Sequence, residues 1–350
     1  MLGWPYSGKA YGYRYVRVDR GTFTELSELD SFLDGGSIEE NALTQIKATG
    51  GVPFMSVPDI GNDLLRVYAD IASDGGQVSH PLGTFVVSTP SASLVGGISK
   101  GKADLYSVLQ IPLEQAMAQP LTLMPGTALV AKAAALLQGL GLNVVADQSG
   151  AVTSGVRNYP SGTSYLEAVN DMLEAAGFSS AAVDAYGSVL LTRYADPASL
   201  SPAVVLRDGH DCTFAPEVRY EFDAFNVPNQ VIARMSNDEV TMTAVATNSD
   251  PGNRYSTVSR GRIVTHVEEV SDIGSQPELQ ALAQRVLSDK TSAVESMEVR
   301  HLYVPFAIGS AVLLDYSEAG ASFLGTSVKR TVRLSPGMPC TTRLRRFVRG

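Results

Sequence analysis

The sequence contains few of the residues that form reactive or cross-linked sites. Among its 350 residues there are two cysteines, four histidines and one tryptophan. Because Cys212 and Cys340 are too few and too far apart in sequence for a disulfide framework, we expect free thiols. The histidines are scattered, and none pairs with another at the spacing of metal ligands. We therefore predict no metal, no cofactor and no disulfide scaffold.

Long apolar runs are also absent. Residues 128–137 form an apolar stretch, but Lys132 interrupts it, and it is far shorter than the ~20 residues that span a bilayer as a helix. Residues 1–10 mix Gly, Pro, Tyr and Lys, without the charged-then-apolar pattern of a secretion signal. We expect a protein that is made in the cytoplasm and has no stable membrane insertion.

Acidic residues outnumber basic ones, and the imbalance is unevenly distributed. The net charge of −9 argues against a protein that neutralises phosphates along an open basic face. Residues 319–350, however, hold seven of the 27 basic residues and no acid, which leaves 20 basic against 36 acidic residues, or −16, elsewhere. We predict that this basic ribbon contacts an acidic neighbour, such as another copy of the chain; a solvated strand face is the alternative. The ribbon consists of Lys329, Arg330, Arg333, Arg343, Arg345, Arg346 and Arg349.

Most of the chain has the pattern of short β-strands. Alternating or continuous apolar runs are separated by Gly-Gly pairs and other turn residues, which is typical of a barrel or sandwich. The predicted strands lie at residues 13–18, 51–57, 64–71, 83–88 and 105–111, and then at 203–206, 218–222, 230–235, 240–246, 297–304, 311–316, 325–334 and 341–348.

A helical pattern separates these two strand-rich regions. Thr127 is expected to cap a first helix, and Ser164 forms a capping box with Glu167 at the start of a second. A hairpin is predicted around Gly187. Together these elements predict a small α/β module over residues 125–197, which we expect to be separable because Pro and Gly residues flank it.

A third predicted helix interrupts the strands of the C-terminal region. Ser275 and Glu278 form its capping box, and its apolar stripe continues to residue 289. The sequence thus predicts three domains: a β-barrel domain at residues 1–124, an α/β insert at 125–197, and a second β-barrel domain at 198–350 that includes the helix 275–289.

Motifs for phosphate or acyl chemistry are incomplete. Residues 3–9 and 96–102 match most of a phosphate-binding loop, but Ala10 and Ala103 stand where the motif needs a hydroxyl for magnesium. We interpret both stretches as Gly-rich turns between strands. Ser99 has the spacing of a hydrolase nucleophile, but it lies in a predicted β-meander and not at a strand-to-helix turn. A hydrolase is therefore the disfavoured alternative.

Candidate metal and acid–base groups have simpler interpretations. Asp208, His210, Asp211 and Cys212 are the one cluster of mixed metal ligands, and we interpret it as a surface Asp-Gly turn. The carboxylates at positions 25, 28, 30, 34, 39 and 40 are expected to be solvated charges. We predict no catalytic, cofactor-binding or metal-binding residues, and no enzyme.

The order of these patterns resembles one known family. The resembling segments are residues 37–43 and 46–50, 105–109, the helix and hairpin at 164–194, 226–231, 259–262, and the helix at 275–289. With strand-rich regions on both sides of a small α/β module, the chain resembles the baseplate hub, or tail-associated minor tail, proteins of tailed phages.

The resemblance implies a fold and a role. The implied fold is mainly β with an α+β insert: two β-barrel modules that resemble duplicated tail-tube proteins, separated by a small α/β domain. The implied assembly is a homotrimer at the tail tip of the virion, whose six barrels join a six-fold tube to three-fold tip proteins. The implied partners are the distal tail or tail tube protein, the tape-measure protein and tip or fibre proteins, with DNA only as passing cargo. Larger hubs carry a lytic domain or fibre, which is not implied here.

Two expectations about surfaces follow from this assembly. The basic ribbon is the candidate subunit interface, and a neighbouring subunit would cover the long strand at residues 11–19. An acidic channel would let DNA slide through. The alternative function is a receptor- or carbohydrate-binding tail-tip protein that uses the aromatic residues Trp4, Tyr6, Tyr11 and Tyr13.

Overall fold

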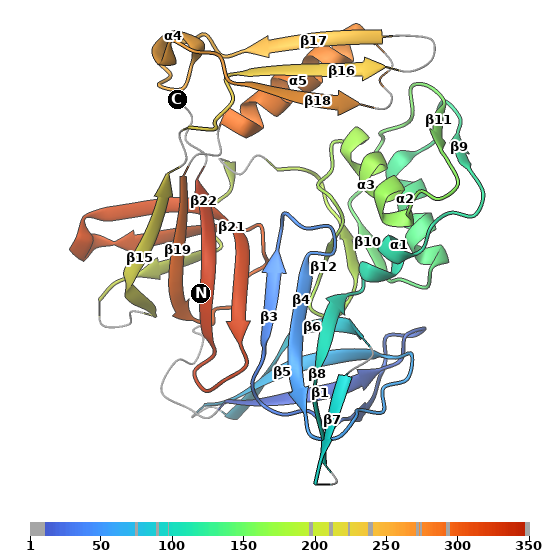
Figure 1. The fold of residues 1–350 in the computed structure, drawn as a ribbon, viewed down its shortest axis with the longest axis vertical. Helices are drawn as coiled ribbons and strands as arrows, with labels where there is room; N and C mark the ends of the chain where they lie inside the picture. The colour runs from blue at the N-terminus through green and yellow to red at the C-terminus, as the bar shows by residue number, and fades with distance from the viewer. Residues whose placement is uncertain are drawn as a thin grey trace.

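The computed structural model describes residues 11–73, 76–88, 91–96, 98–195, 199–209, 213–222, 225–236, 241–270, 273, 275–291 and 295–346, and the fold is mainly β (Figure 1). It consists of two β-units and two inserts.

The first β-unit encloses a single apolar core. The hydrogen-bonded strand order is β3-β4-β8-β6-β5-β1-β2, and β7 pairs with β8. Side chains from β1, β3, β4, β5, β6 and β8 meet in one cluster, Phe54, Phe85 and Leu105 among them, so these strands surround it as a barrel does. The strands are β1 (Tyr11–Val18), β2 (Glu25–Glu28), β3 (Ser37–Asn41), β4 (Ala48–Phe54), β5 (Leu64–Ser73), β6 (Gly76–Val87), β7 (Ser91–Val95) and β8 (Ile98–Ser107).

The second β-unit has a core of the same kind. Its order is β15-β19-β22-β21-β20-β14, and all six strands contribute buried side chains to one cluster that includes Val299, Leu314 and Leu344. A short 3₁₀ turn, Ser317–Ala319, connects β20 and β21. The strands are β14 (Val204–Arg207), β15 (Phe214–Phe222), β19 (Glu295–Leu302), β20 (Ala311–Tyr316), β21 (Ala321–Arg333) and β22 (Pro339–Arg346).

The two β-units repeat one topology. Numbered one to six along the chain, the core strands are β1, β3, β4, β5, β6 and β8 in the first unit and β14, β15, β19, β20, β21 and β22 in the second. In both units the hydrogen-bonded order is 2-3-6-5-4-1. One pair differs in direction, because β1 is antiparallel to β5 whereas β14 is parallel to β20. The repeat confirms the predicted pair of β-modules.

The first insert shares its core with the first β-unit. Helices α2 and α3 pack against each other and against Val16, Val18 and Leu64 on the outer side of β1 and β5. Its removal would expose these side chains, which argues against the separability that its Pro and Gly junctions suggest. The elements are α1 (Gln110–Glu114), β9 (Leu121–Leu123), α2 (Leu129–Gly139), β10 (Val144–Ala146), β11 (Arg157–Tyr159), α3 (Tyr165–Ala175), β12 (Ala182–Val183) and β13 (Val189–Leu191).

The second insert occupies the connection between β15 and β19. Helix α5 covers one face of a sheet of order β17-β16-β18, with a separate core that includes Val231 and Leu279. The equivalent connection in the first unit, between β3 and β4, spans residues 42–47. The helix predicted at 275–289 therefore belongs to this insert, and no helix in the described part of the chain is long and apolar enough to cross a bilayer. The elements are β16 (Gln230–Ser236), β17 (Thr241–Thr247), α4 (Thr257–Arg260), β18 (Thr265–Val270) and α5 (Gln276–Thr291).

Three local predictions are wrong. Residues 108–111 leave strand β8 and enter α1. Thr127 does not cap α2, which has no side-chain cap; its hydroxyl donates to the carbonyl of Met124. Strand β1 is not a free edge, since β2 and β5 pair with its two sides, and the adjacent residues Tyr15 and Val16 are both buried.

The predicted cap at Ser164 is confirmed, and it provides a stability test. The Glu167 N–H donates to Ser164 Oγ at 3.1 Å. Ser164→Ala should lower the free energy of unfolding by about 1 kcal/mol, because it leaves an N-terminal amide of α3 without its acceptor. Urea denaturation would measure this change. Ser161→Ala, at an exposed serine before the helix, should change the stability by less than about 0.5 kcal/mol; equal effects of the two variants would contradict the assignment.

Candidate functional site

A strand pair joins the two β-units into one sheet. β21 pairs antiparallel with β3, from Lys329 opposite Asn41 to Arg333 opposite Ser37. Strands β15, β19, β22, β21, β3, β4 and β8 are therefore consecutive members of one sheet across the front of the molecule (Figure 1). The basic ribbon lies on two of them, β21 and β22, except for Arg349, which lies outside the described residues.

Arg330 is buried at this junction, directly opposite Glu40. Its Nε donates to Glu40 Oε2 at 2.6 Å, and its Nη1 donates to the carbonyl of Val304 at 3.2 Å. Its Cζ lies 5.3 Å and 4.5 Å from the ring centroids of Tyr303 and Phe306. Burial is the largest single effect and lowers the pKa of Arg330, but Glu40, Tyr303 and Cys340 together outweigh it, so the pKa is raised. Arg330 is thus held inside the chain and is not available to a partner.

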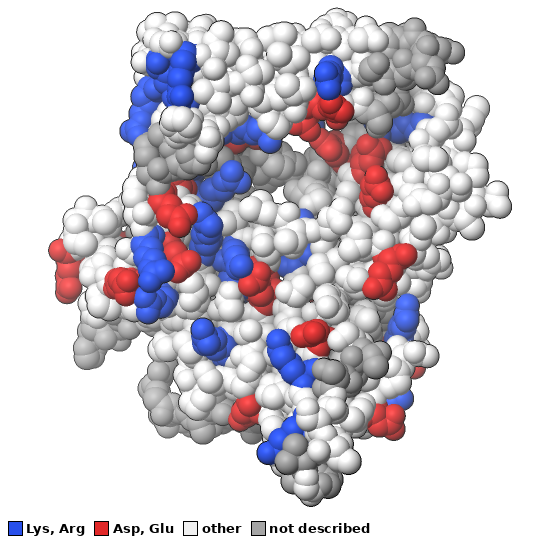
Figure 2. Space-filling model, viewed as in Figure 1, with Lys and Arg blue, Asp and Glu red and all other residues white. Residues whose placement is uncertain are grey.

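Alternate residues of the joined sheet point to opposite sides. On β19, Met297 and Val299 are buried, whereas Glu298 and Arg300 reach solvent. We call the solvent side of strands β15, β19, β22, β21, β3, β4 and β8 the exposed face. Figure 2 shows that acidic and basic side chains are mixed on this side of the molecule.

Ion pairs within the chain connect most charges of the exposed face. The side chains are exposed, so each pair stabilises the fold by only about 0–1 kcal/mol. The chain itself therefore supplies part of the acidic neighbour that the basic ribbon predicts. The pairs are Arg343 with Glu221 at 2.5 Å, Arg300 with Glu217 at 2.8 Å and Lys329 with Glu39 at 2.9 Å.

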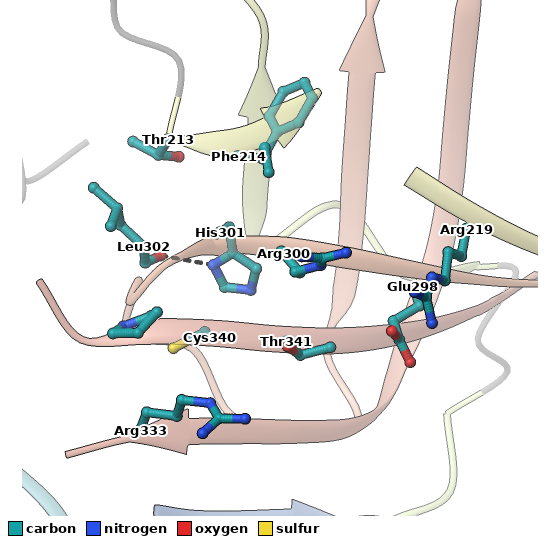
Figure 3. A pocket seen from close by; sticks show the side chains of 12 residues that line it. Thr213, Phe214, Arg219, Glu298, Arg300, His301, Leu302, Arg333, Cys340 and Thr341 are labelled. Atoms are coloured by element: carbon teal, nitrogen blue, oxygen red, sulfur yellow. Dashed lines mark hydrogen bonds between the residues drawn. The ribbon is translucent and has the colours of Figure 1, made fainter. Parts of the chain in front are cut away.

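An open hollow of about 730 Å³ lies on the exposed face. Arginines from three strands border it, Arg219 of β15, Arg300 of β19 and Arg333 of β21, together with Glu298 (Figure 3). The lining is basic. Its two candidate reactive groups are His301 and Cys340, and neither is activated.

His301 lines the hollow but is structural. Its Nδ1–H donates to the carbonyl of Leu302 at 2.6 Å, so its Nε2 accepts from the Thr342 hydroxyl at 2.7 Å. Burial lowers the pKa of His301 to about 4, although the backbone hydrogen bond opposes the shift. The ring is therefore neutral at physiological pH, with both nitrogens engaged.

Cys340 is the second candidate. It is a free, buried thiol, as expected, and its Sγ–H donates to the carbonyl of Met338 at 3.4 Å. Burial raises the pKa of Cys340 to about 12. Because the thiolate is the reactive form, this thiol is inert at neutral pH. Cys212 lies outside the described residues.

The remaining sequence motifs for phosphate or acyl chemistry lie in a β-hairpin. Gly96, with a φ of +58°, is in the turn between the antiparallel strands β7 and β8, and Ser99 lies within β8 opposite Leu94. Neither a phosphate-binding loop nor a nucleophile elbow has this geometry. The interpretation as a turn between strands is confirmed here; residues 3–9 lie outside the described part.

Metal ligands do not gather within the described ranges, where no group of three or more His, Cys, Asp or Glu side chains could hold an ion. Asp208 instead accepts hydrogen bonds from the Ser317 hydroxyl and the Glu318 N–H. Residues 210–212 of the predicted cluster lie outside the described part.

The prediction of solvated carboxylates is wrong for two of the six. Glu40 is largely buried in its pair with Arg330, and Glu25 holds a hydrogen-bond network together. Glu25 accepts hydrogen bonds from Tyr68 at 2.6 Å and from Arg66 at 2.9 Å. The hydrogen bond from Tyr68 is the largest single cause that lowers the pKa of Glu25, and the Arg66 guanidinium lowers it further. Arg66 also donates to the carbonyl of Tyr186 at 3.0 Å. The network therefore ties the first insert to strand β5.

The aromatic residues of the alternative function do not form a described cluster. The Tyr13 hydroxyl donates to the carbonyl of Ser335 at 2.8 Å, which connects β1 to the second β-unit. Trp4 and Tyr6 lie outside the described residues, as does the side chain of Tyr11.

Comparison with solved structures places this fold among phage tail proteins. The sequence itself matches no family model and no curated protein. The structure is similar to a tail protein from Neisseria meningitidis MC58, with a TM-score of 0.68 at 16% identity over 95% of this chain and 96% of that one. It is similar to the 43 kDa tail protein of prophage MuSo2 from Shewanella oneidensis, with a TM-score of 0.68 at 11% identity over 96% and 98% of the two chains. It is also similar to prophage tail protein gp18 from Listeria monocytogenes, with a TM-score of 0.57 at 11% identity over 95% and 94%. The predicted resemblance is confirmed at the level of the fold.

The junction of Arg330 with Glu40 could not be found from the sequence. The two residues are 290 positions apart. Each follows a residue with the same sign of charge and a more exposed side chain, Lys329 before Arg330 and Glu39 before Glu40. The alternation of charged and apolar residues in β3 and β21 suggests strands, but it does not say which strands are paired.

The buried ion pair gives a second stability test. Arg330→Met should lower the free energy of unfolding by about 3 kcal/mol, the lower end of the range for a broken buried pair, because it leaves the Glu40 carboxylate, only 20% exposed, without its partner. The double variant Arg330→Met with Glu40→Leu should recover part of this loss. Lys329→Met, which removes the exposed neighbour of the same strand, should cost at most about 1 kcal/mol. Denaturant unfolding would measure all three, and a similar cost for positions 329 and 330 would refute the burial argument.

His301 predicts a pH dependence. Its folded-state pKa of about 4 lies below the usual 6.5, so the unfolded chain takes up the proton first as the pH falls. The contribution is complete above about pH 6.5 and is lost toward pH 4, at about 1.4 kcal/mol per pH unit. Between pH 7.5 and 5.5 the free energy of unfolding should therefore fall by about 1–2 kcal/mol through this residue. His301→Gln should lack this part of the drop, whereas His266→Gln, at a half-buried histidine, should retain it; identical profiles of the two variants would contradict the assignment.

Proposed function

We propose that the chain is a structural, non-enzymatic subunit of a phage tail, and that three copies form a hub ring at the tail tip. The observation that carries the proposal is the repeat of one six-strand topology in two β-units of one chain. The similarity of the whole fold to three phage tail proteins supports it.

Two similar β-units in one chain would match a three-fold ring to a six-fold tube. Three chains with two similar β-units each supply six such units, which is the number needed to continue a six-fold tube with a three-fold component. A closed ring of like units requires head-to-tail contacts between different edges. The β21–β3 pair is already such a contact, made within one chain.

We assign the exposed face to the channel of this ring. It is continuous across both β-units, and the first insert packs on the other side of the first unit. The wall of the proposed channel would then have mixed charge, whereas the net charge of the chain leads us to expect an acidic wall. Arg300 and Arg343 lie beside Glu217 and Glu221, so a passing DNA phosphate would meet paired cations and would slide instead of binding.

The proposed partners follow from this position. They are other copies of the chain, the distal tail or tube protein on one side of the ring, tip or fibre proteins on the other, and the tape-measure protein and DNA as passing cargo. Within the basic ribbon, Lys329 and Arg330 pair with Glu39 and Glu40 across the contact between β-units. Arg333 and Arg343 lie on the exposed face and are assigned to the channel wall. Arg345 and Arg346 remain proposed contacts for a neighbour.

Cryo-electron microscopy of assembled tails tests the proposal. We expect three copies of the chain in one ring, with the two β-units of each chain about 60° apart around the axis, because six like units divide the circle. Six copies, or two β-units of one chain at different distances from the axis, would overturn the hub assignment. Isolated protein is a weaker test, since a ring that assembles on a partner need not be stable alone.

A further inference from the structure

We infer that the ring closes through one particular strand pair, in which β7 of one copy adds to β15 of the next. This inference rests on the proposed three-copy ring, and it names the edges that meet there.

The contact within the chain is the template. At the β21–β3 junction, core strand five of the second β-unit pairs with core strand two of the first. If like units follow one another around a ring, core strand five of the first unit must meet core strand two of the second unit in the next copy. Core strand two of the second unit is β15.

Core strand five of the first unit is β6, and β7 is its continuation. The end of β6 pairs with residues 105–107 of β8, and β7 pairs with residues 98–102 of the same strand. β21 behaves in the same way: residues 321–326 pair with β20, and residues 326–332 pair with β22. The part of β21 that meets β3 thus corresponds to β7, which is a separate strand from β6 in the first unit.

Both proposed edges are open in the described chain. There, β7 is paired with β8 alone, and β15 is paired with β19 alone. Strands alternate in direction across the joined sheet, so β15 of a second copy would add to β7 antiparallel, as β3 adds to β21. A nine-residue strand such as β15, with one edge that no described strand pairs with, invites pairing with another chain.

Exposed charges near the two proposed edges have the same signs as those at the β21–β3 contact. At the template, the side of strand five is basic and that of strand two is acidic, as in the pair of Lys329 with Glu39. In the β7–β8 hairpin, Lys100 and Lys102 are exposed. On β15, Glu217 and Glu221 are 61% and 70% exposed, with Arg219 between them. Within one chain, Glu217 and Glu221 already pair with Arg300 and Arg343, and Lys102 pairs with Asp104. Attraction across the proposed contact would therefore come from exposed charges that are shared between the two copies.

Disulfide trapping in assembled tails tests the pairing. Ser93→Cys, on β7, is combined with a single cysteine placed in turn at positions 217 to 221 of β15. The matched control replaces Ser93→Cys by Ser27→Cys, at an exposed serine of β2, which is also at an end of the sheet. Each cysteine is also introduced alone, as a control for disulfides with the native Cys212 and Cys340. Imaging of the same particles shows whether the ring has formed.

The expected result is dimers and trimers linked by disulfides for at least one β15 position with Ser93→Cys, and none with Ser27→Cys. A ring of three copies without any such link would overturn the strand pairing and leave the hub function intact. Links of equal yield from both serines would also overturn it. Particles without a three-copy ring would overturn the hub function, and the pairing with it.

Discussion

The pairing of β21 with β3 is the constraint on which the rest of the architecture depends. It converts two β-units, each with its own core, into one sheet, and the buried pair of Arg330 with Glu40 fixes its register. A slip by one residue would turn one of these side chains to the opposite face and leave the other charge unpaired in the interior. The cost of that slip far exceeds the contribution of any exposed ion pair on the same sheet. The angle between the two units is therefore set by a buried electrostatic contact and not by a flexible connection.

The positions of the inserts follow from the same constraint. An insertion is tolerated where it leaves the shared sheet intact, which means after the last strand of a unit or within a connection between strands. The first insert follows β8 and buries the outer side of β1 and β5, and the second extends the connection between β15 and β19. Neither insert interrupts the β21–β3 pair. The exposed face therefore remains one continuous sheet that belongs to both β-units.

Local parts of this structure could be predicted from the sequence, because their signals lie within a few residues of one another. The caps at Ser164 and Ser275, the turn at Gly187 and most strand positions are of this kind. The predictions failed where tertiary contacts decide. Strand β1 alternates like a half-exposed strand, yet the barrel core buries one side and the first insert covers the other. The repeat is hidden because one β-unit carries a long insertion where the other has a short connection. Net charge likewise does not predict the mixed charge of the exposed face, since it does not record which acids pair with which bases.

The groups that resemble reactive chemistry in the sequence are used to hold the structure. His301 is neutral and bonded through both ring nitrogens, Cys340 is a protonated thiol, and Glu25 binds an arginine and a tyrosine that connect the first insert to β5. Because both nitrogens of the histidine are hydrogen-bonded and burial keeps the thiol protonated, activity at these positions would require breaking the packing that holds them. What the chain presents outward is instead a sheet with paired charges and, among the described residues, two strand edges without a neighbouring strand. Such a surface would serve the repeated contacts of the proposed ring.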